Sequence, residues 1–223
     1  MSHFILMLTH SDRTVADALQ VYRRLRGGPL LHVGFKDIGL PFEELAELVA
    51  LIKADGRQAL LEVVSSTREA ELASLEAAAR LGVDYVLGGR HAQEAVRILR
   101  GRPVRYFPFA GHTVGHPTRL VGDAAEIIED ARALAAIPGV HGLDLLAYRF
   151  DGDVPALARA VVQAVPVPVI AAGSIDSNER IAAMQAAGVW GFTVGSALFD
   201  GLFPADTFRA QVASILEVAG VEP

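Results

Sequence analysis

The stretch PVIAAGSIDSNERIAAMQAAGVWGFTVGSALFDG, residues 168–201, contains two short apolar runs that each end in a Gly-Ser pair. The first run stops at Gly173-Ser174, a segment of helical period follows, and the second run stops at Gly195-Ser196. A strand, a helix and a second strand in this order are typical of a βαβ unit with parallel strands. The two Gly-Ser pairs are therefore predicted to lie side by side, at the carboxyl ends of neighbouring strands.

The same alternation of apolar runs and helical segments continues through the rest of the chain, with short connections. The predicted strands are residues 4–9, 30–35, 59–64, 85–88, 104–109, 142–147, 168–173 and 191–195. Eight strands that are each followed by a helix predict a single (β/α)8 TIM barrel over residues 1–223. A doubly wound open sheet is the alternative.

Residues at the expected helix ends support these boundaries. Thr67, and either Asp176 or Ser177, are typical residues at the start of a helix. Gly82 and Gly188 lie where helices are expected to stop.

One connection is longer than a compact barrel requires. Residues 110–123, AGHTVGHPTRLVGD, follow the fifth predicted strand and precede the next helix. Connections of this length in compact domains are usually functional or mobile. The segment is the best candidate for a lid, with His116 and Arg119 as the residues expected to close over a ligand.

Composition narrows the function classes. More than half of the 223 residues are hydrophobic, so the chain can bury a sizeable core, and the net charge of −6 argues against nucleic acid or an anionic membrane as the main partner. The absence of cysteine excludes disulfides, thiolate catalysis and cysteine-bound metals. The apolar run at residues 4–8 is too short for a signal peptide, so we expect a cytoplasmic protein. Association into a homo-oligomer stays open.

An internal similarity links two quarters of the chain. Residues 62–89 repeat the order of residues 168–195, and matching glycines are 106 positions apart, Gly82 with Gly188 and Gly89 with Gly195. This similarity is either a trace of half-barrel duplication or a common property of βαβ units. If it is a duplication, a second anion site is expected opposite the first. Its residues would be Ser65, Ser66, Gly88 and Gly89.

Gly-Ser strand ends suit a phosphate group. Glycine has no Cβ, so backbone N–H groups can approach phosphate oxygens, and a following helix N-terminus adds further N–H groups. In TIM barrels the loops after strands 7 and 8 frequently bind phosphate. Gly173, Ser174, Gly195 and Ser196 are therefore predicted to bind the phosphate of a small metabolite, although tight turns alone would also explain the glycines.

The stretch VIAAGSIDSNERIAAMQAAGVWGFTVGSALFDG resembles the C-terminal quarter of the ribulose-phosphate-binding (phosphate-binding) TIM-barrel superfamily. The resemblance implies a TIM barrel and a phosphorylated substrate, with phosphate contacts at the two Gly-Ser pairs. It does not identify a member family. The chain lacks the Asp-x-Lys-x-x-Asp motif of the sugar-phosphate decarboxylases and the metal-binding His and Asp set of the pentose-phosphate epimerase. Where histidine-biosynthesis isomerases place aspartates after strands 1 and 5, it has His10 and Gly111-His112.

Lys36 is a candidate for a reacting residue, because eighteen of the twenty basic residues are arginine and the only lysines are Lys36 and Lys53. In LLHVGFKD, alternation places His32, Gly34 and Lys36 on one face, which points Lys36 into the barrel mouth. A lysine there can act as a base, form a Schiff base or place a cation beside an enolate. Glu62 is its expected partner, and the competing interpretation is a structural ion pair of Lys36 with Glu62 or Asp37.

Other candidates come from the remaining strand ends. His10 and His112 follow opposite strands and would suit proton transfer at a sugar carbon. Asp144 lies inside an otherwise apolar strand, and Arg149 follows that strand as an anion contact or a solvated side chain. No ligand spacing demands a metal, and no cofactor is expected.

These residues support three hypotheses. The first is an isomerase or epimerase of a small phosphorylated sugar or keto acid, with His10 and His112 or Lys36 and Glu62 as acid and base. The second is an aldolase or decarboxylase that uses Lys36. The third is a non-catalytic barrel that binds a phosphorylated metabolite.

Overall fold

Eight parallel strands form a closed barrel in the computed structural model, which describes residues 2–221. The strands are β1 (His3–Met7), β4 (His32–Lys36), β5 (Gln58–Val63), β6 (Tyr85–Gly88), β7 (Arg105–Phe107), β10 (Leu143–Leu145), β11 (Val169–Ala171) and β12 (Gly191–Val194). Their spatial order, β10-β11-β12-β1-β4-β5-β6-β7, is the chain order taken around a ring. The ring closes where Asp144 N–H donates to the Pro108 carbonyl and Ala110 N–H donates to the Asp144 carbonyl, both at 2.9 Å. The predicted TIM barrel is confirmed, and the open-sheet alternative is wrong.

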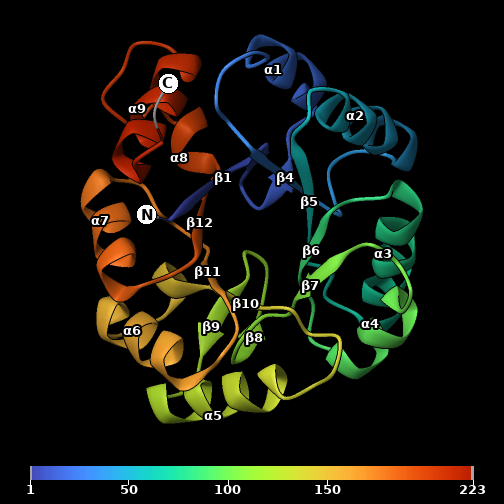
Figure 1. Ribbon diagram of the computed structural model, residues 1–223, viewed down its shortest axis with the longest axis vertical. Helices are drawn as coiled ribbons and strands as arrows, with labels where there is room; N and C mark the ends of the chain where they lie inside the picture. The colour runs from blue at the N-terminus through green and yellow to red at the C-terminus, as the bar shows by residue number, and fades with distance from the viewer. Residues whose placement is uncertain (1, 222–223) are drawn as a thin grey trace.

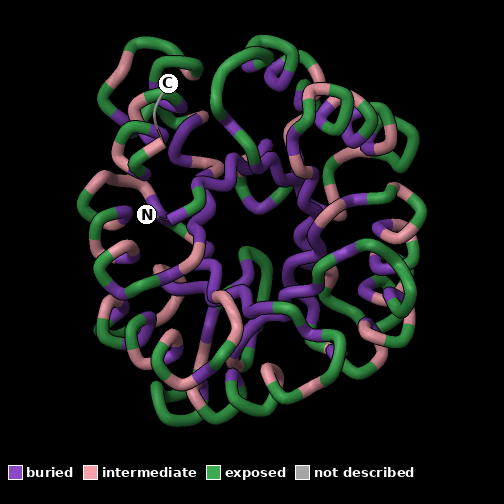
Figure 2. Tube along the Cα trace, viewed as in Figure 1, coloured by how far each residue is buried: buried purple, intermediate pink, exposed green. Residues whose placement is uncertain are grey.

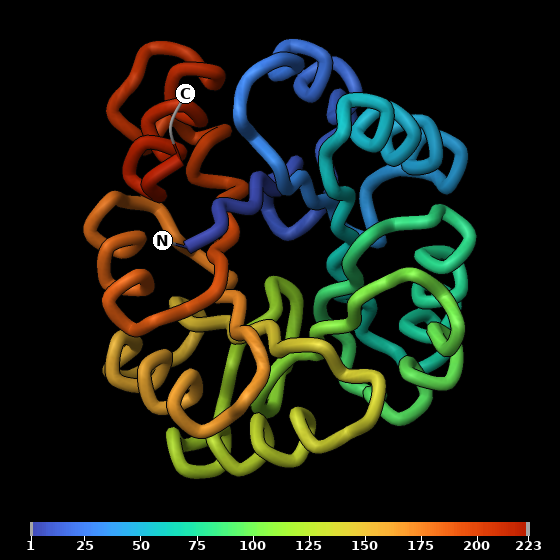
Figure 3. The backbone as a smooth tube through the Cα atoms, in the orientation of Figure 1, coloured from blue at the N-terminus to red at the C-terminus, as the bar shows by residue number. Residues whose placement is uncertain are grey.

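Helices surround this barrel, and the chain travels once around the ring (Figures 1 and 3). They are α1 (Ala18–Arg24), α2 (Phe42–Ala54), α3 (Arg68–Leu81), α4 (Ala92–Leu99), α5 (Ala124–Ala135), η1 (Ala147–Arg149), α6 (Val154–Ala164), α7 (Asn178–Ala187), α8 (Ser196–Phe199) and α9 (Phe208–Ala219). None of the helices within residues 2–221 is long and apolar enough to cross a bilayer.

Strand alternation separates two layers of core. Val33 and Phe35 of β4 belong to the large core between strands and helices, whereas Lys36 faces a cavity at the barrel mouth. A smaller core fills the barrel interior, with Ile5, Met7, Leu60, Tyr85, Leu87, Phe107 and Ile170. In Figure 2 the strands form a buried ring and the outward faces of the helices are exposed. The expected inward direction of Lys36 is confirmed by this arrangement.

Helix ends follow the local sequence. The Thr67 side chain accepts a hydrogen bond from Ala70 N–H at 3.2 Å, and Ser177, rather than Asp176, caps α7. Gly82 and Gly188 both adopt the left-handed conformation that ends a helix, with φ of 68° and 86°.

The internal similarity does not extend to the strand ends. Gly89 has φ of 77°, whereas Gly195, its partner in the proposed repeat, has φ of −129°. The match between Gly82 and Gly188 is thus explained by their common role as left-handed residues at helix C-termini. They give no support to a second strand-end site with the geometry of the first.

Two β-hairpins extend the barrel at its mouth. The first, β2 (Thr9–His10) with β3 (Arg13–Thr14), directly follows β1. The second, β8 (His112–Val114) with β9 (Arg119–Val121), occupies most of the long connection at 110–123. The segment predicted as a lid is therefore an ordered hairpin.

Candidate functional site

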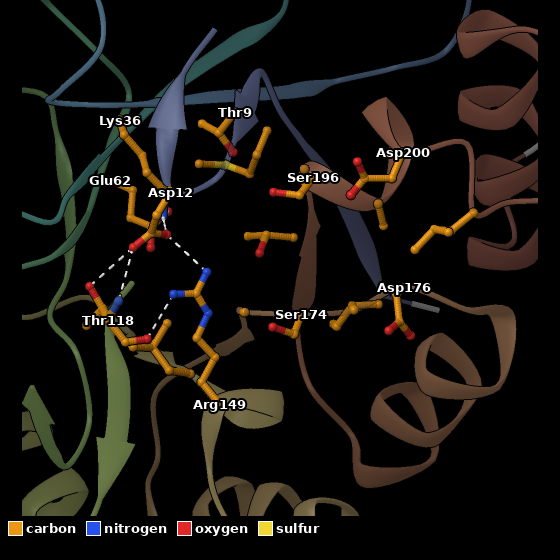
Figure 4. Close-up of a pocket in the computed structure, with 18 residues that line it drawn as sticks. Thr9, Asp12, Lys36, Glu62, Thr118, Arg149, Ser174, Asp176, Ser196 and Asp200 are labelled. Atoms are coloured by element: carbon orange, nitrogen blue, oxygen red, sulfur yellow. Dashed lines mark hydrogen bonds and ion pairs between the residues drawn. The ribbon is translucent and has the colours of Figure 1, made fainter. Parts of the chain in front are cut away.

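A cavity of about 220 Å³ opens at the carboxyl ends of the strands, the end at which TIM barrels bind ligands. Residues from both ends of the chain and from both hairpins line it. They are Met7, Thr9, Asp12, Lys36, Glu62, Thr118, Leu146, Arg149, Gly173, Ser174, Ile175, Asp176, Thr193, Gly195, Ser196, Ala197, Asp200 and Leu202. Figure 4 shows two groups, with charged side chains around Asp12 on one side and the two serines on the other.

The charged group is centred on Asp12, which is almost fully buried. The Lys36 ammonium donates to Asp12 Oδ1 and lies 3.3 Å from Glu62 Oε2. Arg149 Nη2 donates to the same Asp12 oxygen at 3.0 Å. Two cations and two carboxylates thus form one cluster, which we call the Asp12 cluster: Asp12, Lys36, Glu62 and Arg149.

The cluster keeps Asp12 and Lys36 charged. Burial alone would raise the pKa of Asp12, but Lys36 and Arg149 together lower it well below the usual value of 3.8. Burial likewise opposes charge on Lys36, yet Glu62 and Asp12 raise the pKa of the Lys36 ammonium above 10.5. An ammonium ion is therefore fixed at the barrel mouth at neutral pH.

Asp12 reaches the cluster from a strained turn. The turn joins β2 to β3 and consists of Ser11 and Asp12, with φ of 47° and 64°. Two-residue hairpins favour such positive φ values, although glycine or asparagine usually supplies them. Residues in this conformation persist only when neighbouring contacts hold them. The ion pairs of Asp12 supply such contacts.

The β8–β9 hairpin is hydrogen-bonded to the Asp12 carboxylate. Thr118 N–H donates to Asp12 Oδ2 at 3.1 Å, and Arg149 Nη1 donates to the Thr118 carbonyl at 2.9 Å. His116 Nδ1 is 3.7 Å from Asp12 Oδ2. His116 thus lies beside Asp12 without lining the cavity, whereas Arg119 lines a more open outer cavity.

Asp144 lies beneath the cluster, inside the barrel. Its neighbours Leu143 and Leu145 face the helices, so alternation turns Asp144 inward, where it is fully buried. Neither of its carboxylate oxygens has a hydrogen-bond partner within residues 2–221. Burial, followed by the nearby Glu62, raises the pKa of Asp144 well above 3.8, against the opposing effect of Lys36 and Arg149. Burial thus favours the protonated, uncharged form of Asp144 over its carboxylate.

Asp144→Asn should change how stability depends on pH. The folded-state pKa is raised, so the stability contributed by the protonated acid is full below the unfolded pKa of about 4 and is lost as pH rises toward the folded pKa. The asparagine variant has no such loss. Urea unfolding should therefore show the variant gaining stability relative to the native protein as the pH rises above about 4. A stability difference independent of pH would mean that the pKa of Asp144 is the same in the folded and unfolded states.

The two Gly-Ser pairs meet at the other side of the cavity. Gly173, Ser174, Gly195 and Ser196 all line it, and Ser174 has φ of 56°. Within the described chain, no hydrogen bond uses the backbone N–H of Ser174, Ser196 or Ala197. Free N–H groups and hydroxyls of this kind are donors for an anion. We call Gly173, Ser174, Gly195, Ser196 and Ala197 the anion grip.

Gly195 also has a packing role. A Cβ at this position would lie 2.6 Å from Thr9 Oγ1 and 3.1 Å from the Thr9 carbonyl. Glycine is therefore required for the close approach of the grip to the hairpin that carries Asp12. The tight-turn explanation and the anion-binding explanation of this glycine are compatible.

Carboxylates are more numerous than cations around the cavity. Asp176 is paired with Arg180 at 2.7 Å, and Asp200 is paired with His10 at 3.0 Å. Attraction for an anion would thus come from local donors rather than from the overall charge of the cavity. Among residues 2–221, no three His, Asp or Glu side chains are grouped to hold a metal ion.

The two candidate histidines are not brought together. The chain continues beyond β1 and β7 into the two hairpins, which contain His10 and His112, and neither histidine lines the cavity. His10 contacts Asp200, and His112 borders a separate cavity beside α5. The expected arrangement of the two histidines across a shared mouth is therefore not found in the structure.

Internal carboxylates occupy the region of the second predicted anion site. Ser65, Ser66 and Gly89 border a small cavity of about 100 Å³, while Gly88 lies at the end of β6. The Ser65 hydroxyl donates to Asp37, and the buried Glu71 accepts the N–H groups of Arg90 and His91. These protein carboxylates already use donors that an anion would need, so we propose no ligand there.

Sequence reasoning missed Ala197 of the anion grip and two polar residues that line the cavity from the hairpin turns, Asp12 and Thr118. Both lie in hairpin turns, where strand alternation gives no direction for a side chain. The only signal for Asp12 was its place in the polar stretch THSDR directly after the first strand. Thr118 belongs to the long connection that was expected to be functional.

Comparisons with known proteins agree with the fold. No family model matches the sequence, and no curated protein matches it significantly. Among solved structures, the mutant tryptophan synthase α-subunit of Pyrococcus furiosus has a TM-score of 0.69 at 15% identity, with 98% of each chain covered. A structure described as native KDPGal has a TM-score of 0.66 at 16% identity and covers 98% of this chain and 96% of that one. At these identities the similarity shows a TIM-barrel fold.

Proposed function

We propose that the protein is an enzyme that moves a proton next to the carbonyl group of a small phosphorylated sugar or keto acid. One observation carries the proposal: a single cavity joins the anion grip to a buried lysine whose ammonium is flanked by two carboxylates. The grip would hold the phosphate. The Asp12 cluster would face the reacting end of the same molecule.

The cluster contains the groups that enolisation needs. Removal of a proton beside a carbonyl puts negative charge on the carbonyl oxygen, and a preorganised cation stabilises that charge. Lys36 is the proposed cation, and Glu62, which lines the same cavity, is the proposed base. Asp12 keeps Lys36 charged and oriented, while the buried Asp144 lies near Glu62. This division of roles favours an isomerase or epimerase.

A Schiff-base lyase is supported less well. Its lysine must lose a proton before it attacks a carbonyl. Here Glu62 and Asp12 raise the pKa of Lys36, which opposes formation of the free amine. Trapping with borohydride in the presence of a keto sugar phosphate separates the two chemistries, because only a Schiff base gives a stable adduct at Lys36.

Ser196→Asp should abolish binding of inorganic phosphate measured by isothermal titration calorimetry. The new carboxylate would place like charge at the anion grip, and aspartate is well tolerated near a helix start. Ser196→Ala should weaken binding about fivefold, the effect of losing one neutral hydrogen bond.

Ser66→Asp is the matched control, because it makes the same change in an exposed serine at the second predicted site. Its affinity for phosphate should equal that of the native protein. Undiminished binding by Ser196→Asp would contradict the placement of the phosphate. Loss of binding in the Ser66 variant would instead favour the second site.

A further inference from the structure

His10 connects the anion grip to the hairpin that carries Asp12. Its Nε2 lies 3.0 Å from Asp200 Oδ1, and because a carboxylate can only accept, this nitrogen carries the hydrogen. Its Nδ1 lies 3.2 Å from the Ser11 hydroxyl. Asp200 follows α8 directly. One histidine thus contacts both the helix of the grip and the turn between β2 and β3.

A second contact runs parallel to the first. Ser11 N–H donates to Ser196 Oγ at 3.1 Å. The Ser196 hydroxyl still has its own hydrogen, which it can donate to a bound anion. A hydroxyl that donates to an anion becomes a stronger acceptor, because hydrogen bonds in a chain polarise one another. An anion bound at the grip would therefore strengthen the hydrogen bond from Ser11 N–H to Ser196 Oγ.

A contact that fixes Ser11 also restricts Asp12, because Asp12 is the next residue of the same turn. Ser11 and Asp12 both have positive φ, so external contacts are needed to keep the turn in place. Asp12 in turn accepts the N–H of Thr118 in the β8–β9 connection. Two hydrogen bonds, Ser11 N–H to Ser196 Oγ and Thr118 N–H to Asp12 Oδ2, are thus linked by the peptide bond between Ser11 and Asp12 and connect the grip to the long hairpin.

We propose that His10 is a positioning residue that couples anion binding at the grip to the placement of Asp12 and of the β8–β9 hairpin. This inference rests on the proposed function, since it takes the grip as an anion site. His10 does not touch the ligand. Its side chain fixes the turn from the solvent side, with 42% of its surface exposed. Because exposed ion pairs add little stability, the protein should remain folded without it.

The test measures hydrogen exchange by mass spectrometry in peptides covering residues 112–121, with and without inorganic phosphate. In the native protein, phosphate should slow exchange of these peptides about fivefold, as one hydrogen bond becomes more persistent. His10→Ala should bind phosphate but show weaker protection of these peptides, because only the Ser11–Ser196 hydrogen bond then holds the turn. His10→Gln, whose amide can still donate to Asp200, should restore it.

The outcomes separate the inference from the proposed function. Phosphate binding without any change in hairpin exchange would overturn the positioning role and leave the grip intact. Equal protection in the native protein and in His10→Ala would do the same. Failure of the native protein to bind phosphate would contradict the proposed function itself. A purely structural role would lower the unfolding temperature of His10→Ala, whereas we expect that temperature to be unchanged.

Discussion

Replacing Glu62 by glutamine should slow the exchange of a substrate C–H proton with solvent by about 10²- to 10⁴-fold, the usual contribution of a general base. Glutamine has nearly the shape of glutamate but cannot take up the proton. The measurement is solvent deuterium incorporation, followed by proton NMR. The substrate is the sugar phosphate that stabilises the protein most in a thermal-shift screen. Binding of that compound should persist, because the anion grip is unchanged.

Asp176→Asn provides a control from the same cavity, since its carboxylate is paired with Arg180 rather than with Lys36. It removes one negative charge as Glu62→Gln does, and exchange should continue near the native rate. If Glu62→Gln exchanged the proton as fast as the native protein, another residue would have to be the base.

Lys36→Met should lower the free energy of unfolding by about 3–5 kcal/mol, the usual effect of removing one partner from a buried ion pair. The ammonium contacts two carboxylates, and all three side chains are nearly inaccessible to solvent. Without it, Asp12 and Glu62 would be two buried acids close together, with Arg149 as the only remaining cation of the cluster. Urea unfolding at pH 7 measures the difference.

The chain's other lysine is the matched control. Lys53 is half exposed and pairs with Asp84 at 3.2 Å, so Lys53→Met should cost no more than about 1 kcal/mol. The Lys36 effect should shrink in acid. Asp12 has a lowered folded pKa, so its stabilising contribution is present above its unfolded pKa and is lost as pH falls through the folded value. Equal effects of the two lysine substitutions would contradict the buried cluster.

The fold could be predicted because its signal is repeated eight times. Each strand is a short apolar run, and a one-residue error at an end changes neither the strand count nor the order. Alternation also gave the direction of Lys36, since Val33 and Phe35 on either side of Gly34 must face the helices. The direction of Glu62 followed only from the structure. Its neighbours on both faces of β5 are apolar, so the sequence pattern was symmetrical there.

The positions of site residues in the two hairpins, β2–β3 and β8–β9, could not be predicted from the sequence. The sequence predicted His10 and His112 at the ends of barrel strands. In the structure the barrel strands end earlier, and the two histidines belong to the hairpin strands β2 and β8. Asp12 reaches the mouth because Ser11 and Asp12 both have positive φ. The sequence Asn-Gly would predict such a turn, whereas Ser-Asp does not. The meeting of the two Gly-Ser pairs at one cavity was predictable, because it depends on the order of the strands and not on the direction of any side chain.

The most direct test of the account is a thermal-shift comparison of sugar phosphates with the same sugars lacking the phosphate. A tight ligand stabilises the folded state by about 2.7 kcal/mol at a hundred times its Kd, so binding is readily seen. We predict that at least one phosphorylated compound raises the unfolding temperature, that its unphosphorylated form does not, and that Ser196→Asp removes the effect. Equal shifts by a sugar and its phosphate, or a shift that survives in Ser196→Asp, would contradict an anion grip at the ends of β11 and β12.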